Sequence, residues 1–327
     1  MMITCPHCMG RHKHTVERCP VKNIEIPAAF RNDLIKGIPN VVLFVIGYRG
    51  HGKTCFLSSF FHTLYNGVMA DRKIWPGFSF MGLNMDSLNK IHKDYVNILE
   101  RGYVPPPNLV MFPTPLLLRF QRIPFKGRGF KRLFNHSNQG DIIFTFYDIG
   151  GETYEVEQSI RENLPILKEI NTLLFLIDLP RLVEDAQEKL PVEQRLHDLI
   201  NIVYLAKEGL GGRRKKNIIV CFSKADLMWD KEEIFGPLAM RRGHDAPSLD
   251  ELPEYFKKLS ANSHAIAKFM ERKYPTFYND LCNNFASVFF TSLSSLGNQP
   301  VGDRISVLAP SHIFDPVLWT LKSERYL

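Results

Sequence analysis

Short apolar runs recur along the chain, and segments with helical periodicity separate most of them. The first run, Val41–Ile46, is continuously apolar and rich in β-branched residues, as expected for a strand covered on both faces. Helical patterns follow near residues 53–66, 154–169, 191–208 and 255–275. This alternation predicts an α/β fold with a mostly parallel sheet and helices on both faces. Further strands are predicted at Leu116–Phe120, Ile142–Tyr147, Leu173–Ile177, Ile218–Phe222 and Ser287–Phe290.

Two stretches interrupt the alternation. Residues 67–115 separate the first predicted helix from the second predicted strand, and they include a run of three prolines. Residues 236–254 combine glycine, proline and charged residues, as a surface excursion does. Segments of this length are usually functional loops. We therefore predict one domain over residues 26–327, enlarged by these two insertions, behind a separate unit of residues 1–25.

The N-terminal unit carries a pattern typical of a zinc knuckle. Cys5 and Cys8 form a CxxC pair, and Cys19 follows a run that contains two histidines. Three thiolates and one imidazole complete a tetrahedral Zn²⁺ site. We predict His14 as the fourth ligand, with His12 as the alternative. The competing interpretation is a reduced, flexible tail.

Composition narrows the class of protein. With 327 residues, 45% of them hydrophobic and 23% charged, the chain is not expected to be disordered. No window reaches the roughly 18 uninterrupted apolar residues that indicate a membrane span. The start of the chain lacks a secretion signal, so a cytoplasmic location with reduced cysteines is predicted. The net charge of +7 permits an anionic partner, and phosphate, nucleic acid and anionic lipid all fit.

The segment Gly47–Thr54 (GYRGHGKT) matches the GxxxxGK[ST] pattern of a phosphate-binding loop, between a predicted strand and a predicted helix. Backbone N–H groups of such a loop face phosphate oxygens, and the helix N-terminus adds the positive end of its dipole. Lys53 is expected to reach the β- and γ-phosphates, and the Thr54 hydroxyl to bind Mg²⁺. His51 is expected to be exposed to solvent, with a hydrogen bond within the loop as the alternative. The other loop positions predicted to contact the nucleotide are Gly47, Arg49, Gly50, His51, Gly52 and Cys55.

Two tetrapeptides at predicted strand ends select the nucleotide. Asp148–Gly151 (DIGG) matches DxxG, whose acidic residue holds the Mg²⁺ hydration shell and whose last N–H faces the γ-phosphate. Ser223–Asp226 (SKAD) matches [NTS]KxD. Its carboxylate would accept hydrogen bonds from the N1–H and 2-amino groups of guanine, which adenine does not offer in the same places. GTP or GDP with Mg²⁺ is therefore the predicted ligand, contacted by Asp148, Ser223, Lys224 and Asp226.

The order of these motifs resembles the GTPases of the TRAFAC class over about residues 40–325. The resemblance implies a P-loop NTPase fold of the Ras-like GTPase type. In that class a threonine ahead of the second strand closes on Mg²⁺ and the γ-phosphate, and Thr114 occupies that place, with Thr63 as the rival. A serine-containing loop after the last strand touches guanine O6. Ser294 and Ser295 would fill that role, with Ser292 as the other register.

More narrowly, the chain resembles the bacterial double-GTPase group of that class. The supporting features are the cysteine knuckle, the GYRGHGKT loop, the DIGGE and SSLG segments, and Phe314–Trp319 (FDPVLW). The resemblance implies a protein partner, with another GTPase as one candidate, in a multi-gene system of the kind linked to biological conflict.

The predicted rate of hydrolysis depends on the residue after the DxxG glycine. Many Ras-like GTPases have a glutamine there, and this chain has Glu152. A carboxylate accepts a hydrogen bond from the attacking water but donates none to the phosphoryl oxygens, so slow intrinsic hydrolysis is expected. Arg49 or Arg161 would compensate if either reached the phosphates, as an arginine finger does; the competing interpretation is ordinary surface arginines. The predicted catalytic residues are Lys53, Thr114, Gly151 and Glu152.

Three functions follow from these patterns. The first is a GTP-hydrolysing molecular switch, in which GTP orders the segments around Thr114 and Gly151. The second is a GTP-binding scaffold or interaction module with little hydrolysis, which Glu152 favours. The third is a nucleic-acid-binding adaptor in which the zinc knuckle and the positive charge dominate. The basic cluster Gly212–Lys216 would be a contact for nucleic acid or an anionic surface, and the competing interpretation is a solvated loop. Because that cluster lacks interleaved aromatic residues, nucleic acid is the least favoured partner. An ATPase or small-molecule kinase is a minor alternative.

Overall fold

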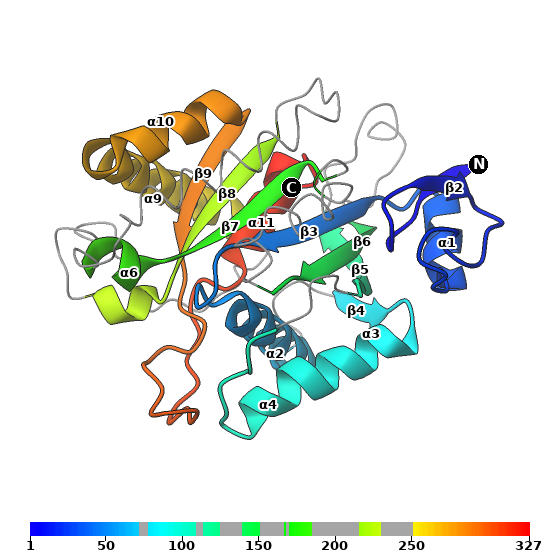
Figure 1. Cartoon of the computed structure of the whole chain (residues 1–327), viewed down its shortest axis with the longest axis horizontal. Helices are drawn as coiled ribbons and strands as arrows, with labels where there is room; N and C mark the ends of the chain where they lie inside the picture. Colours follow the sequence, from blue (N-terminus) through cyan, green and yellow to red (C-terminus); the bar gives the residue numbers. More distant parts are fainter. Residues whose placement is uncertain are drawn as a thin grey trace.

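The computed structural model of the chain describes residues 1–71, 78–108, 114–124, 139–150, 167, 170–184, 216–229 and 251–327. A seven-stranded sheet forms its centre, with the strand order β4-β5-β6-β3-β7-β8-β9 (Figure 1). These strands are β3 (Asn40–Ile46), β4 (Ser79–Gly82), β5 (Leu116–Pro124), β6 (Gln139–Asp148), β7 (Thr172–Asp178), β8 (Asn217–Ser223) and β9 (Ser287–Ser292).

The strands that carry the sequence motifs run parallel. β3 pairs in parallel with β6 on one side and with β7 on the other, and β8 continues the parallel order to β9. β5 and β4 extend the sheet antiparallel at the far edge. Because the carboxyl ends of β3, β6 and β8 lie at one edge of the sheet, the three loops that follow them meet there. The predicted mostly parallel α/β sheet is confirmed.

Helices cover both faces, and the alternation of side chains along each strand decides which face each residue joins. Val41, Leu43 and Val45 of β3 belong to a core with α2 and α11. Val42, Phe44 and Ile46 belong to a second core with α6 and α10. The helices are α1 (Ala28–Ile35), α2 (Lys53–Asp71), α3 (Met85–Lys90), the π-helix η1 (Ile91–Val96), α4 (Asn97–Glu100), α6 (Leu179–Glu184), the 3₁₀-helix η4 (Ala225–Met228), α9 (Leu252–Lys273), α10 (Pro275–Asn284) and α11 (Asp315–Ser323).

The insertion between the first predicted helix and the second predicted strand is more than a loop. Its described part contributes β4 to the sheet edge and then α3, η1 and α4, which lie together beside α2 (Figure 1). Asn84 caps α3 by accepting a hydrogen bond from the backbone N–H of Ser87 at 3.1 Å. The insertion therefore packs against the helix that follows the phosphate-binding loop.

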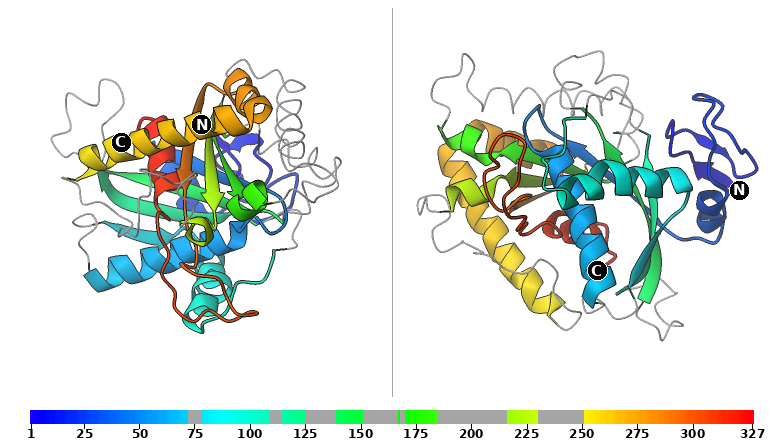
Figure 2. Two further views of the ribbon diagram at one scale, coloured as in Figure 1. Left: turned by 90° about the vertical axis from the view of Figure 1, so that its left-hand side faces the viewer. Right: turned by 90° about the horizontal axis from the view of Figure 1, so that it is seen from below.

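The N-terminal unit packs against the strands β5 and β6 at one end of the sheet (Figure 2). A short antiparallel hairpin, β1 (Met2–Thr4) and β2 (Arg11–Lys13), precedes α1. Phe30 of α1 and the thiols Cys5 and Cys19 share a buried cluster with Leu117 and Ile143 of the sheet. The interpretation of these residues as a flexible tail is wrong, because burial against the sheet holds them.

Several predicted features lie outside the described residues. No helix in the described part of the chain combines the length and apolar character needed to cross a membrane. The predicted helix at 255–275 is α9, which begins at Leu252 and ends at Lys273.

The features outside the described residues are the helices near 154–169 and 191–208, most of the 236–254 insertion, Gly151, Glu152, Arg161 and residues 212–215 of the basic cluster.

Candidate functional site

The loop between β3 and α2 turns sharply at three glycines that have positive φ. Gly47, Gly50 and Gly52 lie at φ values of 151°, 84° and 83°. A Cβ atom on Gly47 would lie 2.6 Å from the carbonyl oxygen of Leu176, so only glycine fits there. The loop leads directly into α2, whose first residues are Lys53 and Thr54. This is the strand–loop–helix geometry that a phosphate-binding loop requires.

Lys53 and Ser223 hold the loop from the inside. Lys53 is 6% exposed, and its Nζ donates hydrogen bonds to the carbonyl oxygens of Gly47 at 2.7 Å and Tyr48 at 3.1 Å. Ser223, at the end of β8, donates from Oγ to the carbonyl oxygen of His51 at 2.9 Å. The serine of the SKAD segment thus fastens the end of β8 to the phosphate-binding loop.

The prediction that His51 is exposed is wrong. Its side chain is buried, and Nδ1 lies 2.9 Å from the carbonyl oxygen of Leu176. The histidine ring thus pairs with a backbone oxygen of β7 instead of facing solvent. Burial lowers the pKa of His51 to about 4, so the ring stays neutral at physiological pH and adds no charge to the loop.

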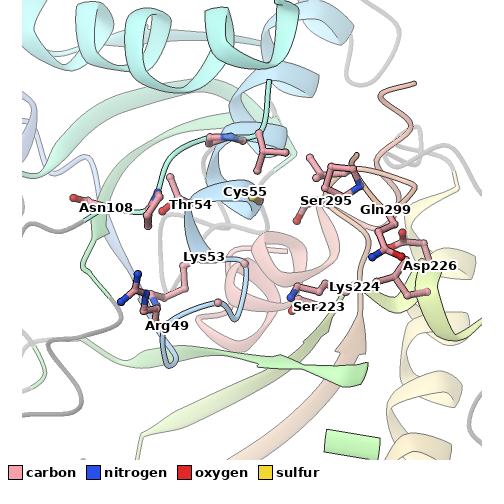
Figure 3. A pocket seen from close by; sticks show the side chains of 18 of the residues that line it. Arg49, Lys53, Thr54, Cys55, Asn108, Ser223, Lys224, Asp226, Ser295 and Gln299 are labelled. Atoms are coloured by element: carbon pink, nitrogen blue, oxygen red, sulfur yellow. The ribbon is translucent and has the colours of Figure 1, made fainter. Parts of the chain in front are cut away.

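A cavity of about 430 Å³ opens above the loop, and the sequence motifs line it from two ends. Figure 3 shows Arg49, Lys53 and Thr54 on one side, with Asn108 close by. On the other side lie Ser223, Lys224, Asp226, Ser295 and Gln299. The residues predicted to bind phosphate and those predicted to recognise the base therefore line one shared cavity.

At the second end of the cavity, the carboxyl group of Asp226 is held by Ser294. Burial raises the pKa of Asp226, while the hydrogen bond from Ser294 lowers it in part. Ser294 is buried, and its Oγ accepts a hydrogen bond from the backbone N–H of Gly297 at 2.8 Å. It lies behind the cavity lining. Ser295 lines the cavity, and its buried Oγ has no hydrogen-bond partner among the described residues.

Lys224 makes an ion pair that the sequence did not indicate. Its Nζ lies 2.5 Å from Oδ2 of Asp178, a buried residue at the end of β7. Arg181 of α6 lies 3.9 Å from the same carboxylate oxygen and donates to the carbonyl oxygen of Arg49 at 3.3 Å. Asp178 could have been found from its place, since it is an acidic residue at the carboxyl end of an apolar strand. The pair holds the SKAD segment beside the phosphate-binding loop.

Asp148 stands at the end of β6, behind the cavity wall. Its side chain is 3% exposed, and Tyr95 donates a hydrogen bond to Oδ2 at 3.0 Å. Oδ1 is buried and has no partner among the described residues. Carboxylate and hydroxyl oxygens are the donors that Mg²⁺ prefers. The unpaired Oδ1 and the Thr54 hydroxyl on the cavity wall therefore fit the predicted magnesium ion.

The threonine predicted as γ-phosphate sensor and its rival are both absent from the lining of this cavity. Thr114 is exposed, just ahead of β5, and Thr63 lies within α2 with a buried Oγ1. The chain approaches the site earlier, at Asn108, whose Nδ2 donates to the backbone oxygen of Asp148 at 2.7 Å. The role of Thr114 stays a prediction.

Two distant segments meet to complete the wall of the cavity. The backbone N–H of Val104 donates to Asp303 O at 2.8 Å, and that of Ile305 donates to Gly102 O at 2.8 Å. The Arg304 guanidinium carbon lies 3.9 Å from the centroid of the Tyr103 ring. The proline-rich end of the insertion is therefore joined to the loop that follows β9.

The N-terminal cysteines gather as a set of metal-binding atoms. One ligand atom from each of Cys5, Cys8, His12 and Cys19 lies within 4.8 Å of the others. The fourth member is His12, so the prediction of His14 is corrected to its alternative. His14 lies beyond the end of β2, and its Nδ1 is 3.1 Å from the carbonyl oxygen of Met1.

The surroundings of these thiols suit a cation. Backbone N–H groups of His7, Gly10 and Lys22 donate to the three sulfur atoms at 3.3–3.4 Å. Burial raises the pKa of Cys5 to about 12. A bound Zn²⁺ stabilises thiolates against such a penalty, and S₃N is one of its common ligand sets.

No protein-family model and no curated protein matches this chain. Solved structures give distant matches. The signal recognition particle receptor SRb-GTP/SRX complex from Chaetomium thermophilum aligns at 13% identity, covering 81% of this chain and 94% of that chain, with a TM-score of 0.36. The GTP-bound Ski7 GTPase-like domain of S. cerevisiae aligns at 13% identity over 80% and 44% (TM-score 0.34). Toc33 from Arabidopsis thaliana aligns at 11% identity over 91% of each chain (TM-score 0.34). Matches with such low identities and TM-scores carry no functional argument. A proposal about function must therefore be argued from the residues of this chain.

Proposed function

We propose that this chain binds guanine nucleotide with Mg²⁺ and acts as a GTP-hydrolysing molecular switch. The observation that carries the proposal is the single cavity that has Lys53 and Thr54 at one end and Asp226 at the other. A nucleotide has a polyanion at one end and a hydrogen-bonding base at the other, so it matches both ends at once. The glycine-rich loop supplies backbone N–H groups for the phosphates.

Selectivity for guanine would come from the carboxylate at the base end. Asp226 would accept hydrogen bonds from the N1–H and 2-amino groups, and Ser294 holds the carboxylate in place for them. Adenine has an unprotonated N1 and no 2-amino group, so the same carboxylate would face a lone pair. The unpaired hydroxyl of Ser295 lies on the cavity wall, where it would donate to guanine O6.

At the phosphate end, Lys53 would exchange the carbonyl oxygens of Gly47 and Tyr48 for the β- and γ-phosphate oxygens. Thr54 and Asp148 are the residues that would hold Mg²⁺, with Thr114 as a further ligand if its segment closes. When bound, Mg²⁺ neutralises charge on the β- and γ-phosphate oxygens. Arg49 lines the cavity beside Lys53 and would add a second cation toward the γ-phosphate.

Hydrolysis transfers the terminal phosphoryl group from GTP to water and yields GDP and phosphate. We propose that Gly151 and Glu152 act beside the γ-phosphate, the first through its backbone N–H and the second by accepting a hydrogen bond from the water. Loss of the γ-phosphate would release the segments that contact it. Single-turnover phosphate release separates this switch from the GTP-binding scaffold, which would bind GTP and leave it intact.

Competition between nucleotides tests the proposal directly. We expect fluorescent GDP bound to the purified chain with Mg²⁺ to be displaced by GTP and GDP, with ATP at least about 100-fold weaker, because a mismatch of buried hydrogen-bonding groups costs on the order of 3 kcal/mol. Equal competition by ATP would remove the guanine assignment. Failure of every purine nucleotide to bind would remove the site itself.

We also propose that residues 1–25 form a zinc knuckle in front of a GTPase domain of residues 26–327. The cluster of Cys5, Cys8, His12 and Cys19 supports it. From the family resemblance we further propose a cytoplasmic protein with a protein partner, another GTPase being the first candidate, in a bacterial multi-gene system. Nucleic acid is not proposed as a partner.

Metal analysis should find about one Zn²⁺ per chain, and Cys19→Ser should remove nearly all of it, because a structural zinc site needs its full ligand set. The loss should also expose the N-terminal unit to limited proteolysis, since Cys19 is buried against the sheet. Cys282→Ser, which changes an exposed thiol on α10, is the matched control and should keep the metal. The proposal would be contradicted if the wild-type chain contained no metal and Cys19→Ser gave the same proteolysis pattern as the wild-type chain.

A further inference from the structure

The π-helix η1 in the first insertion places a buried tyrosine against the nucleotide site. Tyr95 is 2% exposed, and its ring packs edge-to-face on Phe61 of α2 with centroids 5.5 Å apart. Single π-helical turns are rare and are frequently found at functional sites. Here the hydroxyl of Tyr95 reaches across to the carboxylate of Asp148.

The two oxygens of that carboxylate have different surroundings. Oδ2 accepts the hydrogen bond from Tyr95 at 3.0 Å, while Oδ1 is buried without a partner among the described residues. Leaving a buried acceptor unpaired costs about 1–3 kcal/mol, and more for a charged group. Burial raises the pKa of Asp148, while the hydrogen bonds from Tyr95 and Asn108 and then the charge of Lys53 lower it in part. The unpaired oxygen therefore belongs to a site that a further donor would complete.

A second side chain from the same insertion holds Asp148 from the backbone side. Asn108 donates from Nδ2 to the carbonyl oxygen of Asp148 at 2.7 Å. Tyr95 and Asn108 thus hold one residue at two points, and both come from the segment that begins after β4. The motif aspartate is therefore oriented by the insertion, in addition to the strand that carries it.

We propose that Tyr95 is a positioning residue for magnesium: it fixes the Asp148 carboxylate through Oδ2 so that Oδ1 is presented to the hydration shell of the Mg²⁺ that accompanies the nucleotide. This inference rests on the proposed function. It makes retention of the nucleotide by Mg²⁺ dependent on η1. Removing a side chain that hydrogen-bonds to a metal ligand commonly lowers metal affinity about 10- to 100-fold.

The test is the release rate of fluorescent GDP as a function of free Mg²⁺, compared between the wild-type chain and Tyr95→Phe. The variant keeps the ring packed on Phe61 and removes only the hydroxyl. The Mg²⁺ concentration for half-maximal retention should rise about 10-fold. The release rate in EDTA, where no Mg²⁺ is bound, should stay within about twofold of wild type, since a positioning role acts only through the metal.

Two comparisons guard against a general loss of structure. Tyr65→Phe removes a hydroxyl from α2 near the same helix, where the ring meets His92 of η1 with centroids 5.6 Å apart, and it should leave the Mg²⁺ dependence unchanged. In an Asp148→Ala background, Tyr95→Phe should add no further change, because the two residues act as one unit.

Three results for Tyr95→Phe would overturn the inference. The Mg²⁺ requirement could be the same as that of the wild-type chain, GDP release could be accelerated in EDTA as much as it is with Mg²⁺, or the Mg²⁺ requirement could be lower than that of the wild-type chain. The last would mean that Tyr95 withholds the carboxylate instead of presenting it. If the wild-type chain retains no guanine nucleotide at any Mg²⁺ concentration, the proposed function fails and the inference falls with it. The two failures are therefore distinguishable.

Discussion

Replacing Lys53 with alanine should lower the affinity for GTP and GDP about 100- to 1,000-fold, because truncating one partner of a buried, hydrogen-bonded charge pair costs about 2–5 kcal/mol. The Nζ atom is buried in the loop and already oriented by the carbonyl oxygens of Gly47 and Tyr48. α2 contains no lysine besides Lys53. The substitution would therefore leave the loop without the lysine expected to face the phosphates.

The measurement is a titration of fluorescent GDP and GTP with Mg²⁺, with the thermal midpoint measured alongside. Lys93→Ala is the matched control, since Lys93 is an exposed lysine on η1 and its loss should leave affinity within about twofold. Nucleotide binding that survives in a folded Lys53→Ala variant would show that the cavity is not the phosphate site.

Replacing Asp226 with asparagine should exchange guanine for xanthine specificity. In the proposed site the carboxylate accepts a hydrogen bond from the 2-amino group, and an amide N–H₂ in its place would face that group as a second donor. Xanthine carries an oxygen at that position, which the amide would satisfy. We expect GTP affinity to fall about 100-fold and xanthosine triphosphate to bind more tightly than GTP, because a hydrogen bond to a charged group is worth about 1.5–3 kcal/mol.

Competition with both triphosphates measures this exchange in one experiment. Asp303→Asn changes an exposed acidic residue in the loop that follows β9, so it controls for the loss of one negative charge near the cavity. A variant that loses both nucleotides equally would indicate a structural role for Asp226. Unchanged GTP binding would place the base elsewhere.

The motif-bearing strands were predictable because each is encoded locally. The predicted runs in β3, β7 and β8 are continuously apolar, as expected for strands buried on both faces. Both ends of each strand lie within two residues of the predicted ends. The elements of the insertion were not predictable in the same way. β4 exists because β5 offers its edge, and η1 because α2 offers a face; neither is a strong local pattern.

The same division separates the residues of the site. Lys53, Thr54 and Asp226, which line one cavity, could be selected from spacing, because the GxxxxGK[ST] loop and the strand-end tetrapeptide are each continuous in sequence. Tyr95 and Asp178 could not, since each acts on a partner about 50 residues away, at separations of 53 and 46 positions. His12 was left as one of two candidates because spacing alone permits either histidine.

The sequence by itself determined where the motif-bearing strands lie along the chain, the glycine-rich loop between β3 and α2, and the positions of Lys53, Thr54, Asp148 and Asp226 within their motifs. Each of these depends on neighbours within a few positions. Only the tertiary structure decided that His51 is buried, that His12 joins the cysteines and that Tyr95 donates a hydrogen bond to Asp148. These depend on which surfaces the folded sheet brings together, because burial and hydrogen bonding follow distance in space and not position along the chain.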